Sequence, residues 1–396
     1  MAHHRVNDDK NKLRHRGVSR GLVLALLAVV LVAACVVVWF RVGDHVNREA
    51  DQAAATCVKG PATVTILADP DITPGLTAVA AAYSDTHPVV RDHCVRIAVA
   101  ARDAKVTLDG LTGNWDTASM GAYPAAWVPQ SSVWAAELTT AKPDLVDGDP
   151  DSLVTSPVVL ATAPELGTKL SGRLDWGQLP TLQRRDDSLG DFGLQGWGSL
   201  RMAMPREGQS DPTALAAQAV AMRVTRSMGT LTADDAASPR VASSIDALTE
   251  SAPRSPDGSP AGAAGAIADA SDPATAAIHA VPITEQRLYQ LTKNDARARL
   301  AEVMPSGPTP IADFPVVHLK GDQVPEFAGA AVAEFLTFAG KPEHLRALTV
   351  LGFRGDAPLP AKTATVTFPV TDDPMPNPEN QAIVTINKLI YGPSAG

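Results

Sequence analysis

The chain has 396 residues, a formal net charge of -9, 45% hydrophobic residues and only 5% aromatic residues. This length allows about two lobes of about 100 to 200 residues, or one large domain. The 32 prolines and 29 glycines indicate many connections, and a core built mainly from alanine, valine and leucine is typical of an α/β protein. Nucleic-acid binding needs a basic face that offsets phosphate charge, so the acidic balance argues against a nucleic-acid partner.

The N-terminal segment predicts a membrane anchor. Residues 1–20 are polar and basic, and residues 21–40 form an uncharged apolar run of 20 residues. At about 1.5 Å per helical residue this run reaches roughly 30 Å, the thickness of a bilayer's hydrocarbon core. Because basic residues precede it, the tail should stay in the cytoplasm and the rest of the chain should lie outside. We expect a single-pass cell-membrane protein with a linker at 41–56 and an extracytoplasmic folded domain.

Two alternatives to an intact anchor stay open. A cleaved signal peptide is disfavoured because the run is long and no small-x-small cleavage site follows it. The segment Val32–Cys35 resembles a lipoprotein processing box, in which Cys35 would be lipidated. Apolar residues 36–40 continue past that cysteine, where a lipoprotein usually turns polar. In the anchored form and in the lipidated form alike, the body of the protein is tethered to the outer face of the membrane.

The first folded segment predicts a β-α-β unit. Residues 62–67 and 94–99 are rich in β-branched residues, and a helix from about Gly75 to Tyr83 separates them. A right-handed crossover makes the two strands parallel. Cys57 and Cys94 precede these strands at the same edge of the sheet, so outside the cytoplasm we expect a disulfide worth about 3 to 4 kcal/mol. Two reduced, buried thiols are the alternative.

The segment 124–134 predicts a strand, a tight loop and a helix start. The apolar run 125–128 stops at Pro129, and Gln130, Ser131 and Ser132 follow before apolar residues resume at helical spacing. Ser131 or Ser132 can cap the helix, and ligands of open α/β sheets sit beyond the carboxyl ends of strands. The alternative is a packed turn with a solvated cap.

The second half of the chain predicts a further lobe. The extended run 152–162 can cross to it, and a helix over 214–228 follows Ser210 and Asp211, either of which can cap that helix. A helix start favours anions, but the carboxylate of Asp211 would itself occupy that position or would repel an anionic ligand from it. Residues 236–272 predict long flexible loops.

The last elements predict a return to the first lobe. A strand over 277–282 can carry the chain back, and Thr284 caps a helix with Glu285 and Gln286 in its first turn. A helix over 325–338 follows, with phenylalanines on one face. Beyond residue 358 we expect a tail with possible edge strands.

The order of these elements resembles a type II bacterial extracellular solute-binding protein. More narrowly, it resembles the solute-binding region of actinobacterial membrane-anchored proteins that often also carry a von Willebrand factor A domain. The match spans roughly residues 54 to 360, and the segments that carry it are Cys57 with the strand after it, Ala126–Trp134, Ser156–Ala161, Ala280–Gln286, Asp313–Pro315 and Gly352–Arg354. The resemblance implies an α/β, two-lobed periplasmic-binding-protein-like fold with a double crossover. It places lobe I at 57–152 and 280–358, lobe II at 153–279, and a tail at 359–396.

Two departures from the pattern are visible. No Asp-x-Ser-x-Ser motif follows Arg354, so we expect no von Willebrand domain in this chain. The stretch 204–213 has Asp211 and Pro212 where relatives would carry a glycine after the serine, which counts against conventional ligand capture.

The predicted function is the capture of a small polar solute, of unknown class, in a cleft between the lobes. The candidate ligand-binding residues are Asp69, Trp127, Gln130, Ser131, Ser132, Ser156, Gln209, Ser210, Asp211, Glu285 and Gln286. A transporter or envelope protein is a possible partner. The alternative is an envelope interaction or scaffold protein that keeps the fold without a solute; a filled cleft would favour it, and an open polar cleft would favour capture.

Catalysis and cofactors are not expected. The nine histidines are scattered, and the sequence has no His-x-x-x-His, Cys-x-x-Cys or phosphate-binding loop. We therefore predict a protein that is not an enzyme and that uses no metal or other cofactor.

Overall fold

The computed structural model describes residues 57–392. The predicted cytoplasmic tail, membrane-spanning run and linker, with Cys35, lie outside the described residues. Among residues 57–392, no helix is both long and apolar enough to cross a bilayer. The chain divides into a unit at 1–58 and a unit at 59–396, and the second unit is described below.

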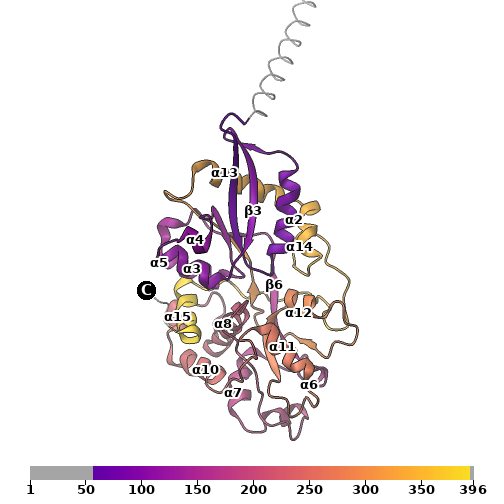
Figure 1. Ribbon diagram of the computed structural model, residues 1–396. Coiled ribbons are helices and arrows are strands. Elements are labelled where there is room, and N and C mark those ends of the chain that lie inside the picture. Colours follow the sequence, from indigo (N-terminus) through magenta and orange to yellow (C-terminus); the bar gives the residue numbers. More distant parts are fainter. Residues whose placement is uncertain (1–56, 393–396) are drawn as a thin grey trace, which may run out of the picture. The chain divides into compact units, whose positions relative to one another are not determined.

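The first sheet has six strands in the order β2-β3-β1-β4-β10-β5 (Figure 1). Their bounds are β1 Pro61–Ala68, β2 Val89–Val90, β3 His93–Ala101, β4 Ala126–Val128, β5 Asp151–Ser152 and β10 Pro315–His318. Strand β1 is parallel to β3 and β4, and β10 is antiparallel to β4. The predicted β-α-β unit is therefore confirmed. Cys57 and Cys94 are disulfide-bonded, which confirms the predicted pair.

Helices cover this sheet and form lobe I with it. Their bounds are α2 Thr73–Ser84, α3 Ala104–Thr112, α4 Thr117–Met120, α5 Ser132–Ala141, η1 Pro143–Leu145, α13 Glu326–Ala339 and α14 Pro342–Thr349. Helix α2 packs against β3, α13 and α14, because its buried residues recur at helical spacing. Tyr83 at its end makes an edge contact with Phe335 of α13, their ring centroids 5.6 Å apart. The predicted helices at 75–83 and 325–338 are thus both present.

The second sheet has four strands and belongs to lobe II. It has the order β7-β6-β8, with β9 also paired to β6, and the bounds are β6 Ser156–Thr162, β7 Ala280–Thr284, β8 Ala301–Val303 and β9 Ile311–Ala312. The helices of lobe II are α6 Pro164–Leu170, η2 Trp176–Gln178, α7 Leu179–Arg184, η3 Ser188–Phe192, α8 Asp211–Thr225, α9 Ala233–Ala236, α10 Pro239–Thr249, α11 Pro260–Asp269 and α12 Glu285–Thr292. Strand β6 is buried along its whole length, so it forms the centre of this lobe.

Three crossings of the chain join the lobes, and the return to lobe I lies later than the sequence predicts. The chain leaves lobe I between β5 and β6 and comes back between β9 and β10, at 313–314. Strand β7, predicted to start the return, pairs with β6 instead. Short apolar strands do not specify their partner, so the sequence pattern could place the strand without placing its sheet.

The predicted loops at 236–272 are mostly helical. Helices α10 and α11 lie there, and Ser238 and Ser259 cap them, each followed by a proline at the first helical position. Val241, Ile245 and Leu248 form the buried face of α10. The alanine, serine and proline content suggested loops, but the caps and this spacing explain the helices.

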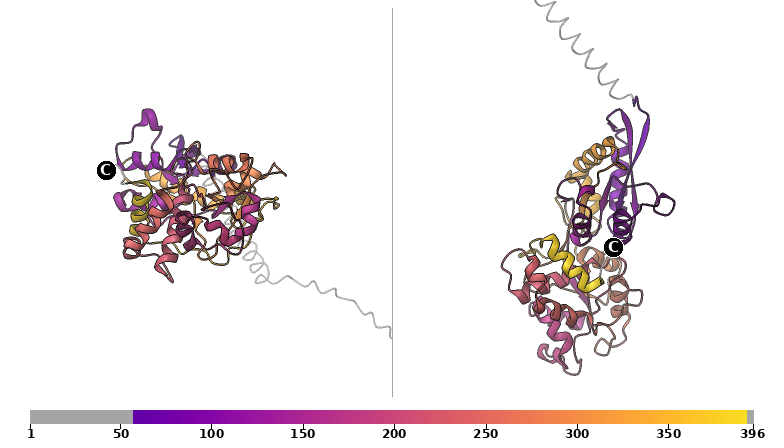
Figure 2. Two further views of the ribbon diagram at one scale, coloured as in Figure 1. Left: turned by 90° about the horizontal axis from the view of Figure 1, so that it is seen from below. Right: turned by 90° about the vertical axis from the view of Figure 1, so that its left-hand side faces the viewer.

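The C-terminal segment is also more ordered than a tail. After Arg354 the chain crosses to lobe II a further time, and the amide of Met375 donates to the carbonyl of Thr309. It ends in helix α15, Asn380–Tyr391, at a position where edge strands or a tail were expected. Helix α15 lies between the two lobes, beside α5 of lobe I and α10 of lobe II (Figures 1 and 2).

Candidate functional site

Asp211 joins the two lobes through hydrogen bonds. It is the first residue of α8 in lobe II, and its carboxyl faces the start of α5 in lobe I. The hydroxyl of Ser131 donates to Oδ2 at 2.6 Å, and Nε1 of Trp134 donates to Oδ1 at 2.7 Å. Asp211 is 2% exposed. Both carboxyl oxygens are therefore occupied by groups of the protein itself.

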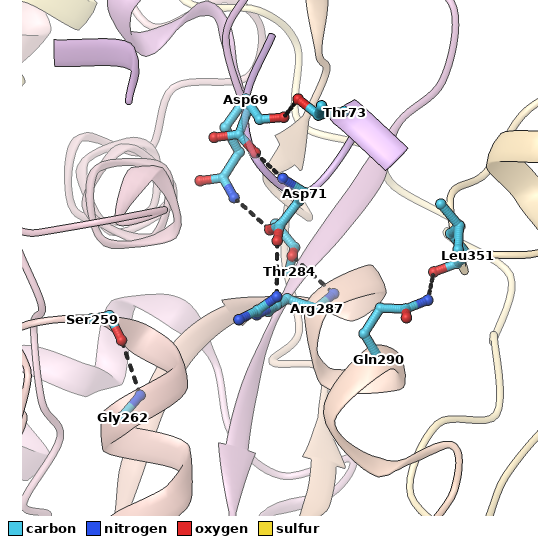
Figure 3. Close-up of polar contacts among 10 residues, drawn as sticks. Asp69, Asp71, Thr73, Ser259, Gly262, Thr284, Arg287, Gln290 and Leu351 are labelled. Carbon is cyan, nitrogen blue, oxygen red and sulfur yellow. Dashed lines mark hydrogen bonds and ion pairs between the residues drawn. The ribbon is translucent and has the colours of Figure 1, made fainter. Parts of the chain in front are cut away.

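A second interlobe contact joins Asp71 to Arg287. Asp71 lies in the turn after β1, and Nη1 of Arg287, on α12, donates to its Oδ1 at 3.1 Å (Figure 3). Nε2 of Gln130 donates to Oδ2 of Asp71 at 3.3 Å. The side chain of Asp71 is 2% exposed and that of Arg287 is 35% exposed, so only one edge of this ion pair reaches solvent.

Asp69 completes this surface between the lobes. Its Oδ1 accepts from the amide of Asp71 at 2.9 Å, and its carbonyl accepts from the hydroxyl of Thr73 at 2.8 Å (Figure 3). We call the set Asp69, Asp71, Gln130, Ser131, Asp211 and Arg287 the interlobe seam.

The seam disfavours ionised carboxyl groups. Burial, followed by the charges of Asp71 and Asp211, raises the pKa of Asp69 well above its ordinary value. Burial raises the pKa of Asp211 to about 7, against the lowering effect of its bonds to Ser131 and Trp134. At neutral pH Asp211 is therefore close to half ionised in the closed seam, and the pKa of Asp69 is shifted in the same direction.

Ser131 and Ser132 have different roles. The hydroxyl of Ser131 also accepts from the amide of Val133 at 3.2 Å, which confirms that Ser131 caps α5. The amide of Ser132 donates to Oδ1 of Asp313 at 2.7 Å, and its hydroxyl donates to the other oxygen of that carboxyl. Because Asp313 lies in the return crossover, Ser132 anchors that crossover instead of facing the seam.

Ser156 and Glu285 belong to the hinge region. The amide of Gln286 donates to the hydroxyl of Ser156 at 3.0 Å. Arg354 donates to both carboxyl oxygens of Glu285, at 2.8 and 2.7 Å, and exchanges two backbone hydrogen bonds with Thr155 of the first crossover. These predicted ligand residues are therefore already bound within the protein, and their bonds fix the crossovers.

A buried carboxyl lies beside this ion pair. Burial, followed by the charge of Glu285, raises the pKa of Glu302 to about 8. Glu302 is on β8, and the amide of Thr367 donates to it at 3.3 Å. This group is protonated at neutral pH.

The remaining predicted residues line the seam only in part. Trp127 is 0% exposed and its Nε1 has no partner among the described residues, so it is a core residue and no ligand platform. Gln209 is half-buried beside the start of α8. The carbonyl of Ser210 accepts from the hydroxyl of Tyr391 at 3.2 Å. The amide oxygens of Gln130 and Gln286 are buried without a partner in the described part of the chain.

The sequence prediction missed several residues of this site. Asp71 stands two positions after Asp69, and Arg287 directly follows Gln286, so both could have been included as neighbours of predicted residues. Trp134 lies in the segment 124–134, for which the sequence predicted a helix start but no role for this side chain. Tyr391 gave no signal, because it lies in the segment expected to be a tail.

The described residues form no metal cluster, and a large groove lies on lobe II away from the seam. Within residues 57–392, no group of three or more histidine, cysteine, aspartate or glutamate side chains is placed to hold a metal ion. A groove of about 740 Å³ opens on lobe II and is lined by residues 204–207, 249–250 and 252–258. None of the predicted ligand residues lines this groove.

Comparisons with known proteins identify relatives and the fold. The sequence matches no protein-family model. It is 35% identical over 398 residues to an uncharacterized protein found in two strains of Mycobacterium tuberculosis, and it is covered completely in that alignment. The chain spans 57% of the length of those relatives.

Three solved structures share the arrangement of elements. Iron-bound HitA from Pseudomonas aeruginosa has a TM-score of 0.51 at 15% identity, over 83% of this chain and 99% of that one. The ferric binding protein from Campylobacter jejuni has a TM-score of 0.53 at 10% identity, with 83% and 97% covered. An ABC transporter from Clostridium perfringens has a TM-score of 0.53 at 11% identity, with 83% and 98% covered. The chain therefore has the mixed α/β, two-lobed fold of periplasmic solute-binding proteins.

Proposed function

We propose that this chain is a membrane-anchored, extracytoplasmic binding protein that captures a small polar solute carrying an ammonium or guanidinium group. The solute enters the interlobe seam when the lobes part. The observation that supports this proposal is the excess of acceptor groups at the seam, where buried carboxyl groups lie close together and the amide oxygen of Gln130 has no donor among the described residues.

Two groups of the seam make up this excess. Oε1 of Gln130 has no partner among the described residues, and its amide nitrogen must face Asp71 because only that nitrogen can donate to a carboxylate. Asp69 receives one backbone amide, and its pKa is raised by the carboxyls around it. Buried polar groups in folded proteins are nearly always hydrogen-bonded, so this set favours an occupant that donates.

The charge of the seam selects the class of solute. Its only cation is Arg287, which Asp71 already binds. An anionic solute would meet the carboxyls of Asp69 and Asp211, and the repulsion would oppose closure. An ammonium or guanidinium group supplies both hydrogen-bond donors and the missing positive charge.

Opening of the lobes gives the solute access. The seam is closed in this structure, and the lobes can rotate about the crossovers at 153–155 and 313–314 and the third crossing after Arg354. The location outside the cytoplasm rests on the apolar run at 21–40 and the basic residues before it. A disulfide at Cys57 and Cys94 agrees with an oxidising compartment.

A thermal-shift screen tests this proposal. The full chain in detergent micelles is melted with amines, guanidinium compounds, amino acids, sugars, anions and metals. A solute at about 100 times its dissociation constant adds about 2.7 kcal/mol of stability. We expect amines or guanidinium compounds to raise the melting temperature of the wild type and of Asp269→Asn, an exposed control, but not of Asp69→Asn. If only anions or sugars act, capture stands and the proposed class is wrong.

A specific observation also favours a second candidate, the envelope scaffold. The donors of α5 and the carboxyl of Asp211 already satisfy one another, so this part of the seam is complete without a solute. A scaffold should stay closed in all conditions. Hydrogen exchange at the amides of Ser132 and Val133 should then require global unfolding, and no solute in the screen should change it.

A further inference from the structure

Helix α15 contacts both lobes at the edge of the seam. It packs against α5 of lobe I and against α8, α9 and α10 of lobe II. Figures 1 and 2 show it at the boundary between the lobes. Its buried face is apolar and includes Ile383, Ile386 and Ile390, while Gln381 and Lys388 are exposed. The helix is therefore held by a continuous hydrophobic face that spans the boundary.

One residue of α15 fastens it to lobe I. Nδ2 of Asn387 donates to the carbonyl of Val133 at 2.9 Å and to Oε1 of Glu137 at 3.1 Å. Both acceptors belong to α5, and Asn387 is 2% exposed. The bonds are shielded from water, so breaking them without replacement leaves buried polar groups unpaired.

Other contacts fasten α15 to lobe II. The hydroxyl of Tyr391 donates to the carbonyl of Ser210 at 3.2 Å, directly before Asp211. At the other end, Glu379 accepts from the amide of Ala233 at 2.9 Å, and its own amide donates to the carbonyl of Leu231 at 3.1 Å. The entry and the exit of the helix are thus both bound to lobe II.

The contacts of α15 meet those of the seam at one point. The ring of Tyr391 packs on that of Trp134, with the centroids 5.0 Å apart. Trp134 also donates to Asp211, and Tyr391 binds the residue before Asp211. Separation of the lobes therefore has to break the bonds of Asp211 and, in addition, release α15 from one of the two lobes.

We propose that α15 is a strap that holds the lobes closed, and that the lobes part only when its contacts with α5 of lobe I are released. Lobe I is the side that yields, because α15 is hydrogen-bonded to lobe II at both ends, whereas on lobe I it packs along α5 and is hydrogen-bonded only through Asn387 among the bonds described above. The strap acts whether or not a solute enters, so this inference does not depend on the proposed solute.

Distance measurements between the lobes test the strap. Spin labels are placed on Lys105→Cys of α3 and Asp246→Cys of α10, both exposed, in the full chain in nanodiscs with Cys35→Ser and without solute. The reference protein should give one dominant distance. Asn387→Ala loses two hydrogen bonds to α5, so the population with a longer distance should grow by about tenfold. Lys388→Ala, an exposed neighbour on the same helix, should leave the distribution unchanged.

A second variant keeps the test decisive if Asn387→Ala folds poorly. Asn387→Leu keeps a side chain of similar shape and removes only the polar contacts with α5, and it should speed hydrogen exchange in α15 and at the start of α5 together, because one opening exposes both. The strap would be overturned by an unchanged distance distribution in folded Asn387→Ala. It would also be overturned if Asn387→Leu sped hydrogen exchange in α15 alone and not at the start of α5. Failure of the solute screen leaves these outcomes unaffected, so the two proposals fail separately.

Discussion

The Asp211→Asn variant should be more stable than the wild type in alkaline solution and not in acid. Asp211 is buried, and its pKa is raised from an ordinary value of 3.8 to about 7. Because the folded state binds the proton more tightly than the unfolded state, the unfolding free energy falls as the pH rises from about 4 to about 7. At about 1.4 kcal/mol for each tenfold change in proton affinity, the fall is about 4 kcal/mol.

Asparagine resembles the protonated carboxyl, and its stability does not depend on ionisation. The unfolding free energies of the variant and of the wild type should therefore cross as the pH rises. Its amide oxygen can accept from Trp134, but its amide nitrogen donates to Ser131, whose hydroxyl proton then loses its acceptor. One lost hydrogen bond costs about 1 kcal/mol. The variant should therefore be less stable by about 1 kcal/mol near pH 4, and more stable by about 3 kcal/mol at pH 8 and above.

Urea unfolding of the full chain in detergent, followed by tryptophan fluorescence from pH 4 to 9, measures this difference. Asp269→Asn serves as the control because that carboxyl is exposed, and its stability should stay parallel to that of the wild type. A gap between wild type and Asp211→Asn that does not change with pH would refute the argument. Asp211 would then be ionised throughout, with its two hydrogen bonds outweighing burial.

Three further predictions concern the hinge and the anchor. Glu302→Gln should reduce the loss of unfolding free energy between about pH 4.5 and 8. The raised pKa of Glu302 makes the wild type less stable as the pH rises, as it does for Asp211, and glutamine has no proton to lose. Urea unfolding midpoints across this pH range measure the difference. Arg354→Met should lower the unfolding free energy by about 3 to 5 kcal/mol, because it leaves Glu285 buried without its cation, whereas a loss below about 1 kcal/mol would contradict that account. Deletion of residues 21–40 should move the protein from the membrane fraction to the soluble fraction of expressing cells, and continued membrane association would count against the anchor.

Local patterns of sequence predicted the elements whose determinants lie within a few residues. The cap at Ser131 and the face of α2 depend on residue types at short spacing, and the parallel pair β1 and β3 follows from the handedness of the connection between two such strands. Such signals survive folding because the residues that carry them contact their own neighbours along the chain. The same holds for α13, whose phenylalanines recur at helical spacing.

The parts that could not be predicted depend on contacts between distant segments. The apolar sequence of strand β7 suits a buried position in either sheet, so only the structure assigns the strand to lobe II. Glu285 was a reasonable ligand candidate at a helix start, but Arg354, 69 residues later, binds it. The segment that became α15 contains apolar residues suited to either a strand or a helix, and packing between two lobes decided the outcome.

The raised pKa values also separate the two candidate functions. When the lobes part, Asp211 enters water and releases its proton at neutral pH, so a rising pH favours the open form, and the raised pKa of Asp69 acts in the same direction. A cationic solute would let both carboxyls ionise in the closed form and would compete with protons for the seam. The affinity of such a solute is measured by titration calorimetry at pH 6, 7 and 8. It should increase with pH and level off above about 7. The number of protons released on binding should decrease over the same range. If the affinity of a bound solute did not change with pH in this range, the solute would have to bind away from both carboxyls, and its site would not be the seam.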